Sequence, residues 1–181
     1  MHMLLRNLLT LFRRGAGSLS IDQVGTLSLR VRLIDLDLLR HMNNGVYLSI
    51  MDLGRIDLLK RIGAAARLRT LGIYPVIVSQ TITFRRSLEL GQRYVLETRF
   101  LGSDEKATYL EQRFVVDGEI YARGVVRARF LRAKGGTVGP AELTEVTGVG
   151  LDDRPLPEWI ARWASDVALP ASRAPAPSIW E

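Results

Sequence analysis

The amino-acid sequence predicts an α+β fold in which a curved antiparallel sheet lies around one long helix. Three observations support this prediction. A segment with alternating apolar residues comes first, at 26–34, a long and mostly apolar helical run follows at 44–62, and strand-like segments with short breaks fill 75–130. One strand, one buried helix and then consecutive strands is an element order typical of α+β domains.

The first predicted strand covers 26–34. Its apolar residues fall at alternate positions, and Arg30 and Arg32 lie between them. This period of two favours a half-buried strand with one apolar face. Asp35 and Asp37 follow directly, and if the strand continues they point to opposite faces. We therefore expect a structural role for Asp35 and no chemistry that pairs the two carboxylates.

The long helix predicted at 44–62 is apolar around most of its circumference. A helix of this kind is usually buried on several sides. Asn44 is a preferred N-cap residue, and Gly63 suits the C-terminal end. Asp52 and Arg55 lie three positions apart, so they are expected to form an ion pair.

The remaining chain up to residue 134 is predicted to be mostly β-structure, after a short connecting helix at 64–71. Breaks at 90–92, at 102–105 and at Asp117–Gly118 each fit a hairpin turn. A further helix is expected at 155–168, and the proline-rich end at 170–181 is expected to be extended.

These patterns divide the chain into three predicted parts. Residues 1–18 favour an N-terminal amphipathic helix, residues 19–134 one folded domain, and residues 135–181 a C-terminal extension. The first part is too short and too charged for a membrane span, which needs about 20 apolar residues. It suits peripheral membrane contact or docking on its own domain or partner.

The composition excludes several kinds of site. The chain of 181 residues has no cysteine and two histidines, so disulfides, thiolate zinc sites, cysteine nucleophiles and multi-histidine metal sites are excluded. We expect no metal and a cytoplasmic location. The net charge of +6 favours anionic partners. We expect no nucleic acid among them, because the basic residues form no long runs and lack interleaved aromatic residues and a recognisable binding motif.

The junction between the first strand and the long helix suggests chemistry. The backbone N–H groups of a helix N-terminus attract negative charge, and they can stabilise the oxyanion that develops on a thioester carbonyl. Asp37 lies just before this helix and could attack the carbonyl carbon directly or act as general base on a water molecule. An Asx turn without chemistry is the alternative, and Asp52 on the helix is the rival acid.

The junction also resembles a known family. Its residues are similar to the motif of the 4-hydroxybenzoyl-CoA thioesterase-like branch of the hotdog superfamily, and especially to the group called thioesterase-superfamily member six. The residues that carry the resemblance are Asp35-Leu36-Asp37-Leu38-Leu39-Arg40-His41-Met42-Asn43-Asn44-Gly45-Val46-Tyr47. The similarity continues through 84–88, 99–102 and 109–111 and covers roughly residues 25–132.

The resemblance implies a hotdog fold and an acyl-CoA thioesterase. It implies a homodimer that could pair further into a tetramer, with active sites at the subunit interface, and acyl-CoA or an acyl-carrier-protein thioester as substrate. No separate cofactor is implied, since coenzyme A is part of the substrate. Asp37 is then the catalytic residue. The substrate-binding residues are the helix-start amides of Asn44 and Gly45, their neighbours His41 and Tyr47, and Arg85 and Arg86 for the phosphates.

One residue departs from the family pattern. The family commonly has glycine where this chain has Arg40. Glycine permits positive φ angles, whereas arginine restricts the loop and adds a cation beside Asp37. Such a cation would favour the ionised carboxylate and make it a weaker base.

Two further functions stay open beside hydrolysis. Leu36, Leu38, Leu39 and Met42 surround Asp37 in the sequence and suit a fatty or aromatic acyl group. A non-catalytic protein that binds acyl-CoA, or that organises a complex at a membrane, is the first alternative. A dehydratase of the same fold is the second, but it needs a histidine and a helix-borne acid together, and His41 lies on another segment.

Overall fold

The fold is a single sheet around one long helix, seen in a computed structural model that describes residues 17–151, 154–171 and 174–179. The predicted helix at 1–18 lies, apart from its last two residues, outside this part of the chain. The elements are β1 (Gly25–Arg30), a 3₁₀ turn (Leu33–Asp35), α2 (Asn44–Arg61), α3 (Ala64–Thr70), β2 (Ile73–Phe84), β3 (Arg93–Ser103), β4 (Thr108–Val116), β5 (Glu119–Arg132), β6 (Thr137–Val138), α4 (Pro140–Thr147) and α5 (Glu158–Asp166).

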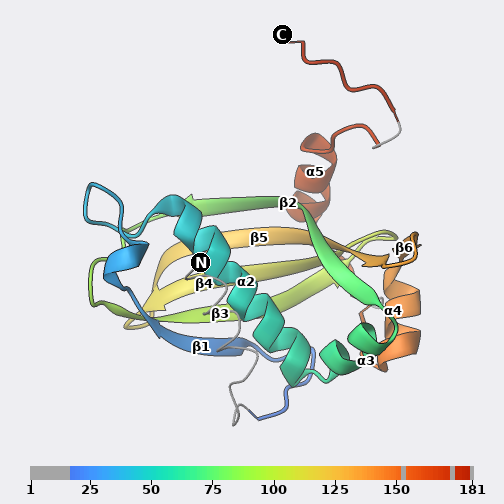
Figure 1. The fold of residues 1–181 in the computed structure, drawn as a ribbon, viewed down its shortest axis with the longest axis horizontal. Coiled ribbons are helices and arrows are strands. Elements are labelled where there is room, and N and C mark those ends of the chain that lie inside the picture. The colour runs from blue at the N-terminus through green and yellow to red at the C-terminus, as the bar shows by residue number, and fades with distance from the viewer. Residues whose placement is uncertain (1–16, 152–153, 172–173, 180–181) are drawn as a thin grey trace.

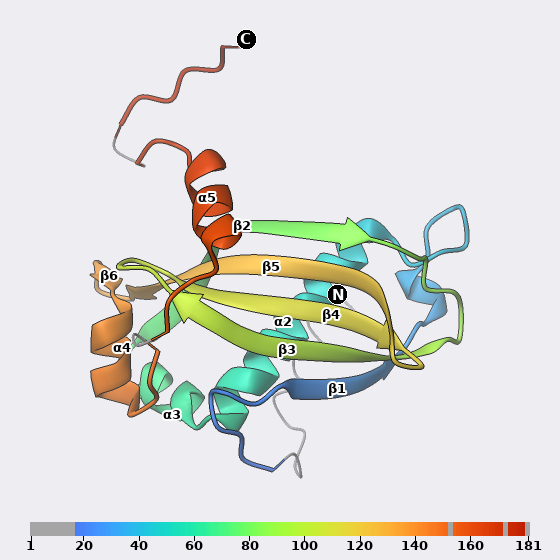
Figure 2. The same cartoon turned by 180° about the vertical axis from the view of Figure 1, so that it is seen from behind.

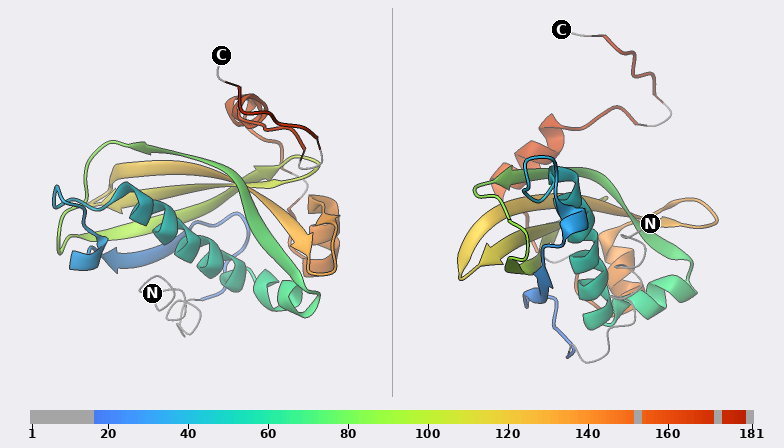
Figure 3. Two further views of the ribbon diagram at one scale, coloured as in Figure 1. Left: turned by 45° about the horizontal axis from the view of Figure 1, so that its top comes forward. Right: turned by 60° about the vertical axis from the view of Figure 1, so that its left-hand side comes forward.

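The sheet is antiparallel, with the strand order β1-β3-β4-β5-β2, and β6 pairs with β5. Figure 1 shows α2 lying across the concave face, and Figure 3 shows the sheet curving over it. The predicted α+β architecture is confirmed. Its outer edges are β1 and β2, so β2 keeps one side without a strand partner in this protomer.

The long helix is buried because most of its surface meets the sheet. Tyr47, Ile50 and Met51 pack in one core with side chains from β3, β4 and β5. Gly54 marks the closest approach, since a Cβ atom there would lie 2.4 Å from Thr98 Oγ1. The helix ends before Gly63, whose φ of 80° confirms the predicted stop.

The first strand is shorter than its pattern predicts. It ends at Arg30 rather than at residue 34, and Leu33 is 74% exposed instead of facing the core. The chain turns here because the buried Asp35 carboxylate accepts a hydrogen bond from Arg32 N–H at 2.8 Å. This local bond closes a 3₁₀ turn, and it agrees with the structural role expected for Asp35.

The predicted hairpin at 90–92 is wrong. β2 pairs with β5, whereas β3 pairs with β1 and β4, so the connection after Phe84 crosses from one edge of the sheet to the other side. Its backbone bonds to the junction instead, with Met42 N–H donating to Leu88 O at 2.8 Å. The other two turns are confirmed as hairpins, and the positive φ angles of Asp117 and Gly118 suit the tighter one.

The C-terminal region contains the expected helix, α5, and also α4, which the sequence patterns do not predict. Ile160 and Ala164 of α5 pack on Tyr109 and Val125 at the outer face of the sheet, which Figure 2 shows from behind. Leu143 of α4 joins a second core at one end of the sheet. How the chain divides into domains stays a prediction. Within the described residues, no helix has the length and apolar character that a membrane span requires.

Candidate functional site

The Asp37 side chain is half-buried in a tight turn between the 3₁₀ turn and α2. Its Oδ1 atom accepts hydrogen bonds from Leu39 N–H at 2.9 Å and His41 N–H at 3.3 Å. The backbone closes the same turn, because Asp37 N–H donates to His41 O at 2.9 Å. One carboxylate oxygen thus forms an Asx turn. The other, Oδ2, has no hydrogen-bond partner within the described residues.

Arg40 adopts the backbone conformation that glycine would provide. Its φ angle is 64°, in the left-handed region, which is energetically unfavourable for residues other than glycine. The turn therefore keeps its geometry despite the substitution. The guanidinium is exposed and, as far as the structure describes the chain, forms no ion pair with Asp37.

The N-terminus of α2 differs by one residue from its prediction. Asn43, and not Asn44, is the N-cap, and its Oδ1 atom accepts from Gly45 N–H at 2.8 Å. Asn43 is fixed there because its own N–H donates to Asp35 O at 2.8 Å. The Gly45 amide is therefore occupied. Asn44 is an exposed residue, and its N–H has no acceptor in the part of the chain that the structure describes.

Tyr47 and His41 hold the junction together. Tyr47 is only 1% exposed, its hydroxyl accepts from Leu88 N–H at 3.1 Å, and its ring contacts Phe84 and Phe114 edge-on. Burial raises the pKa of this phenol. Tyr47 therefore faces the core in this protomer and supports the loop at 85–92. His41 acts through its backbone, which also bridges to Glu89.

Arg85 and Arg86 lie at the same end of the sheet as Asp37, since both backbone N–H groups donate to Tyr121 O and the following loop binds the junction. The Arg85 guanidinium pairs with Glu119 at 2.7 Å and lowers the pKa of that exposed carboxyl. Arg86 lies over the Tyr121 ring at 5.8 Å.

The side chains that the sequence places around Asp37 lie in different environments. Met42 is buried in the core and Leu36 is partly buried, whereas Leu38 and Leu39 are 101% and 76% exposed. The expected apolar surroundings of the acid are therefore split between the core and the surface of the protomer.

A cavity of about 290 Å³ lies instead between α2 and the sheet, in the half of α2 away from the junction. It is mostly apolar, with Ile56 and Leu59 on the helix side and Pro75, Ile77 and Phe130 on the sheet side. The sequence patterns predict a mostly apolar helix and strands in these regions. They do not reveal the cavity, because periodicity reports which face is apolar and not whether the space is filled.

Polar groups border this cavity at Asp52 and Arg55, which form the predicted ion pair. Arg55 also donates to Gln112 Oε1 at 2.7 Å, and Gln112, fully buried, donates to Thr98 Oγ1 at 3.0 Å. Burial lowers the pKa of Arg55, which Asp52 partly opposes. Asp52 thus lines the cavity, whereas Asp37 does not.

The chain matches the family model of the thioesterase-like superfamily over residues 31–164. Protein THEM6 of Danio rerio is 42% identical over 100 residues, which are 55% of this chain and 50% of that protein. Protein THEM6 of Xenopus laevis is 40% identical over 95 residues, 52% of this chain and 46% of that protein. The matched region thus spans about half the length of these curated relatives.

Solved structures share the fold. The probable thioesterase YbaW of Escherichia coli has a TM-score of 0.62 and 22% identity, covering 66% of this chain and 93% of that one. The gentisyl-coenzyme A thioesterase BH1999 has a TM-score of 0.61 and 21% identity, covering 67% and 99%. These likenesses confirm the hotdog fold that the resemblance implies.

Proposed function

Because this chain belongs to the thioesterase-like superfamily, we propose that it is an acyl-CoA thioesterase. The observation that carries the proposal is the junction. Asp37 is fixed by backbone donors with Oδ2 left over, a few residues before a helix whose Asn44 N–H has no acceptor among the described residues. An acid and an oxyanion donor are the two groups that thioester hydrolysis needs.

In this mechanism the thioester oxygen accepts a hydrogen bond from the Asn44 amide, aided by the positive end of the α2 dipole. Asp37 Oδ2 either attacks the carbonyl carbon, giving an anhydride that water opens, or removes a proton from an attacking water. Either route adds one water and releases a carboxylic acid and the thiol. Gly45, already bound to Asn43, supports the helix start, and His41 holds the turn through its backbone.

The apolar cavity between α2 and the sheet is not lined by Asp37, so we place the site in a homodimer. β2 is an edge strand of 12 residues with exposed apolar side chains, among them Tyr74, Val78 and Phe84. Open edges of this kind favour pairing with another strand. A twofold axis through β2 would pair it antiparallel with its copy.

This pairing explains why the acid and the cavity lie apart. The Phe84 end of β2 lies beside Tyr47 and the junction, and Pro75 and Ile77 near its other end line the cavity. An antiparallel pair places each junction next to the partner's cavity. Each site then takes Asp37 and the Asn44 amide from one protomer and the acyl cavity from the other.

The chemistry of the two regions suggests the substrate. An apolar cavity of about 290 Å³ suits a fatty or aromatic acyl group. Arg85 and Arg86, exposed at the junction end, are placed to meet the phosphates of coenzyme A. No further cofactor enters the reaction. We propose a cytoplasmic homodimer, which could pair further into a tetramer and touch a membrane through residues 1–18.

Free-thiol release from a panel of fatty and aromatic acyl-CoA thioesters tests the proposal. Asp37→Asn keeps an Oδ1 acceptor for the turn but removes the nucleophile or base, so the release rate should fall by about 10³-fold or more with an unchanged melting temperature. An Asp37→Asn protein as active as the wild type would refute the role of Asp37. Tight acyl-CoA binding without turnover by the wild type would favour the non-catalytic alternative.

A further inference from the structure

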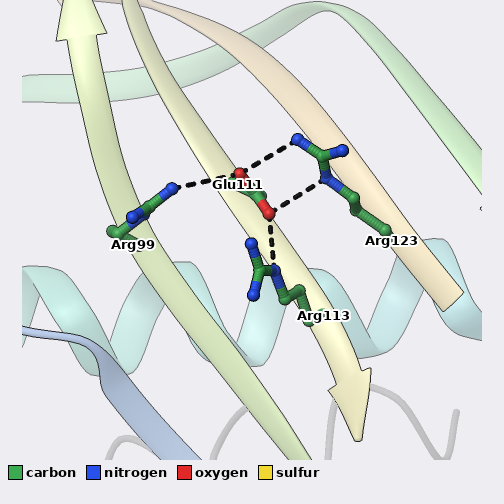
Figure 4. Close-up of polar contacts among 4 residues, drawn as sticks. All are labelled: Arg99, Glu111, Arg113 and Arg123. Atoms are coloured by element: carbon green, nitrogen blue, oxygen red, sulfur yellow. Dashed lines mark hydrogen bonds and ion pairs between the residues drawn. The ribbon is translucent and has the colours of Figure 1, made fainter. Parts of the chain in front are cut away.

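The outer face of the sheet, opposite α2, carries three arginines around one glutamate (Figure 4). Glu111 Oε1 accepts from Arg113 Nε at 2.6 Å and from Arg123 Nε at 3.0 Å, and Oε2 accepts from Arg99 Nη2 at 3.3 Å. The Glu111 side chain is 3% exposed, whereas those of Arg99, Arg113 and Arg123 are 46%, 37% and 44% exposed. We call these four residues the arginine cluster.

The arginine cluster holds more positive charge than Glu111 needs. Arg113 lies directly opposite Arg123 in the strand register, and like charges at such positions destabilise a sheet. A single arginine would neutralise the carboxylate. Each guanidinium has five N–H donors, and Glu111 engages one or two of them. With Glu97, which lies opposite Arg113 in the register of β3 and β4, this surface still has one net positive charge, and most guanidinium donors remain for another partner.

The surroundings of the arginine cluster resemble a protein interface. Trp159 of α5 is 46% exposed, and its ring centroid lies 5.4 Å from the Arg123 guanidinium carbon. Tryptophan and arginine are the residues enriched in interface hot spots. Arg30 and Arg93, paired in the register of β1 and β3, extend the exposed positive charge toward the β1 edge.

We propose that the arginine cluster docks an acidic carrier protein that presents the acyl group as a protein-bound thioester. The inference rests on the proposed hydrolase function and specifies how the substrate is delivered. Carboxylates on the carrier surface would pair with the unused N–H donors, since arginine binds carboxylates through two parallel hydrogen bonds. Glu111 orders the side chains beforehand, so little freedom is lost on docking.

The charges disfavour two other occupants. A second copy of this chain would bring the same positive surface against the arginine cluster, and each chain has a net charge of +6. Nucleic acid offers phosphates along a track, whereas these arginines converge on one carboxylate.

The test compares one dodecanoyl group carried by coenzyme A and by an acyl carrier protein. The variant is the double substitution Arg99→Gln and Arg123→Gln, in which Arg113 stays to pair with Glu111 and preserves the fold. The control is Arg67→Gln with Arg69→Gln, which removes the same charge at two exposed positions of α3. The double variant should raise KM for the carrier thioester by about tenfold, as expected for the loss of a few partly exposed ion pairs. The control, and all rates with the coenzyme A thioester, should stay unchanged.

Equal changes with both thioesters, or no change with either, would overturn the docking proposal. If the wild type hydrolyses neither thioester, the hydrolase function fails while docking is still testable. Calorimetry with the unloaded carrier protein then supports docking if the wild type binds and the double variant does not, and refutes it if neither or both bind. The proposal would be overturned if the wild type, but not the double variant, bound a DNA duplex while neither bound the carrier protein. It would also be overturned if the double variant had a changed sedimentation coefficient, which would place the arginine cluster in contact with a second copy of this chain.

Discussion

Two acids, Asp37 and Asp52, lie in regions of the molecule that are built in different ways. The junction around Asp37 is held by backbone hydrogen bonds and exposes Leu38 and Leu39. The region around Asp52 is packed between α2 and the sheet and encloses a cavity. The junction has a carboxylate oxygen, Asp37 Oδ2, without a hydrogen-bond partner among the described residues, whereas the second region has a cavity and an acid already paired to Arg55. The difference suggests that catalysis needs both regions, contributed by two protomers.

The largest expected effect tests whether the acid and the cavity of one site come from two different protomers. Asp37→Asn removes the acid from the junction, and Ile56→Trp fills the cavity from α2 while leaving the junction untouched. Each variant alone should lose about 10²-fold or more in kcat/KM. When the two are mixed under conditions that exchange subunits, each mixed dimer regains one complete site. Thiol release should then rise to about a quarter of the wild-type rate, from half the dimers with one working site of two.

The control for this experiment is the mixture of each variant with itself, which should stay inactive. If the mixture of the two variants stays inactive although mass spectrometry shows mixed dimers, the acid and the cavity of one site belong to the same protomer. The difference between the two regions would then not reflect a site shared by two protomers.

The packed region should be the less tolerant of added volume. Gly54→Ala brings a Cβ atom within 2.7 Å of Gln112 Nε2 and 2.8 Å of Leu96 Cδ2, besides Thr98. Overpacking of this kind should lower the free energy of unfolding by about 1–3 kcal/mol. At the junction, Gly45→Ala meets its nearest atom, Asn43 Oδ1, at 3.2 Å, and should cost much less. Urea denaturation measures the free energy of unfolding of both variants. Equal losses of this free energy would contradict the difference in packing.

The fold follows from sequence patterns far better than the site does. The α2 run and the turn at Asp117–Gly118 depend on local periodicity and turn chemistry, and both are confirmed. The break at 90–92 also contains a glycine between strand-like segments, yet it joins strands that do not pair. Strand order is decided by long-range pairing, which the local pattern does not contain.

The site shows the same limit on a smaller scale. The motif correctly places Asp37 before a helix start, but the cap is Asn43 rather than Asn44, because a backbone bond to Asp35 fixes it. The sequence gives no hint of the cavity. Nor does it show that Leu38 points to solvent and Tyr47 to the core, since these orientations depend on how the loop at 85–92 packs.

A smaller effect should come from strain at the junction. Arg40 and Asp117 are the two residues other than glycine that have positive φ within the described chain. Arginine tolerates this conformation poorly, whereas aspartate is several-fold enriched in it. Arg40→Gly should therefore stabilise the protein by about 0.5–1 kcal/mol, and Asp117→Gly by less. Thermal denaturation measures both, and a destabilised Arg40→Gly protein would mean that the side chain contributes contacts that outweigh its strain.

The smallest effect on catalysis should come from Asp52→Asn, although this acid lines the cavity. Its carboxylate is engaged by Arg55, and the change leaves Arg55 bound to Gln112 while the pKa of Arg55 loses the support of Asp52. We expect a stability loss of about 1–3 kcal/mol, because the Arg55 side chain is only 11% exposed and loses its charged partner. We expect a kcat within about threefold of wild type, because the proposed reacting acid is Asp37. KM for long acyl groups should rise if the ion pair shapes the cavity rim. The measurement is steady-state thiol release beside Asp37→Asn. A kcat loss for Asp52→Asn as large as that for Asp37→Asn would move the reacting carboxylate from the junction to the helix and leave the Asp37 turn a purely structural role.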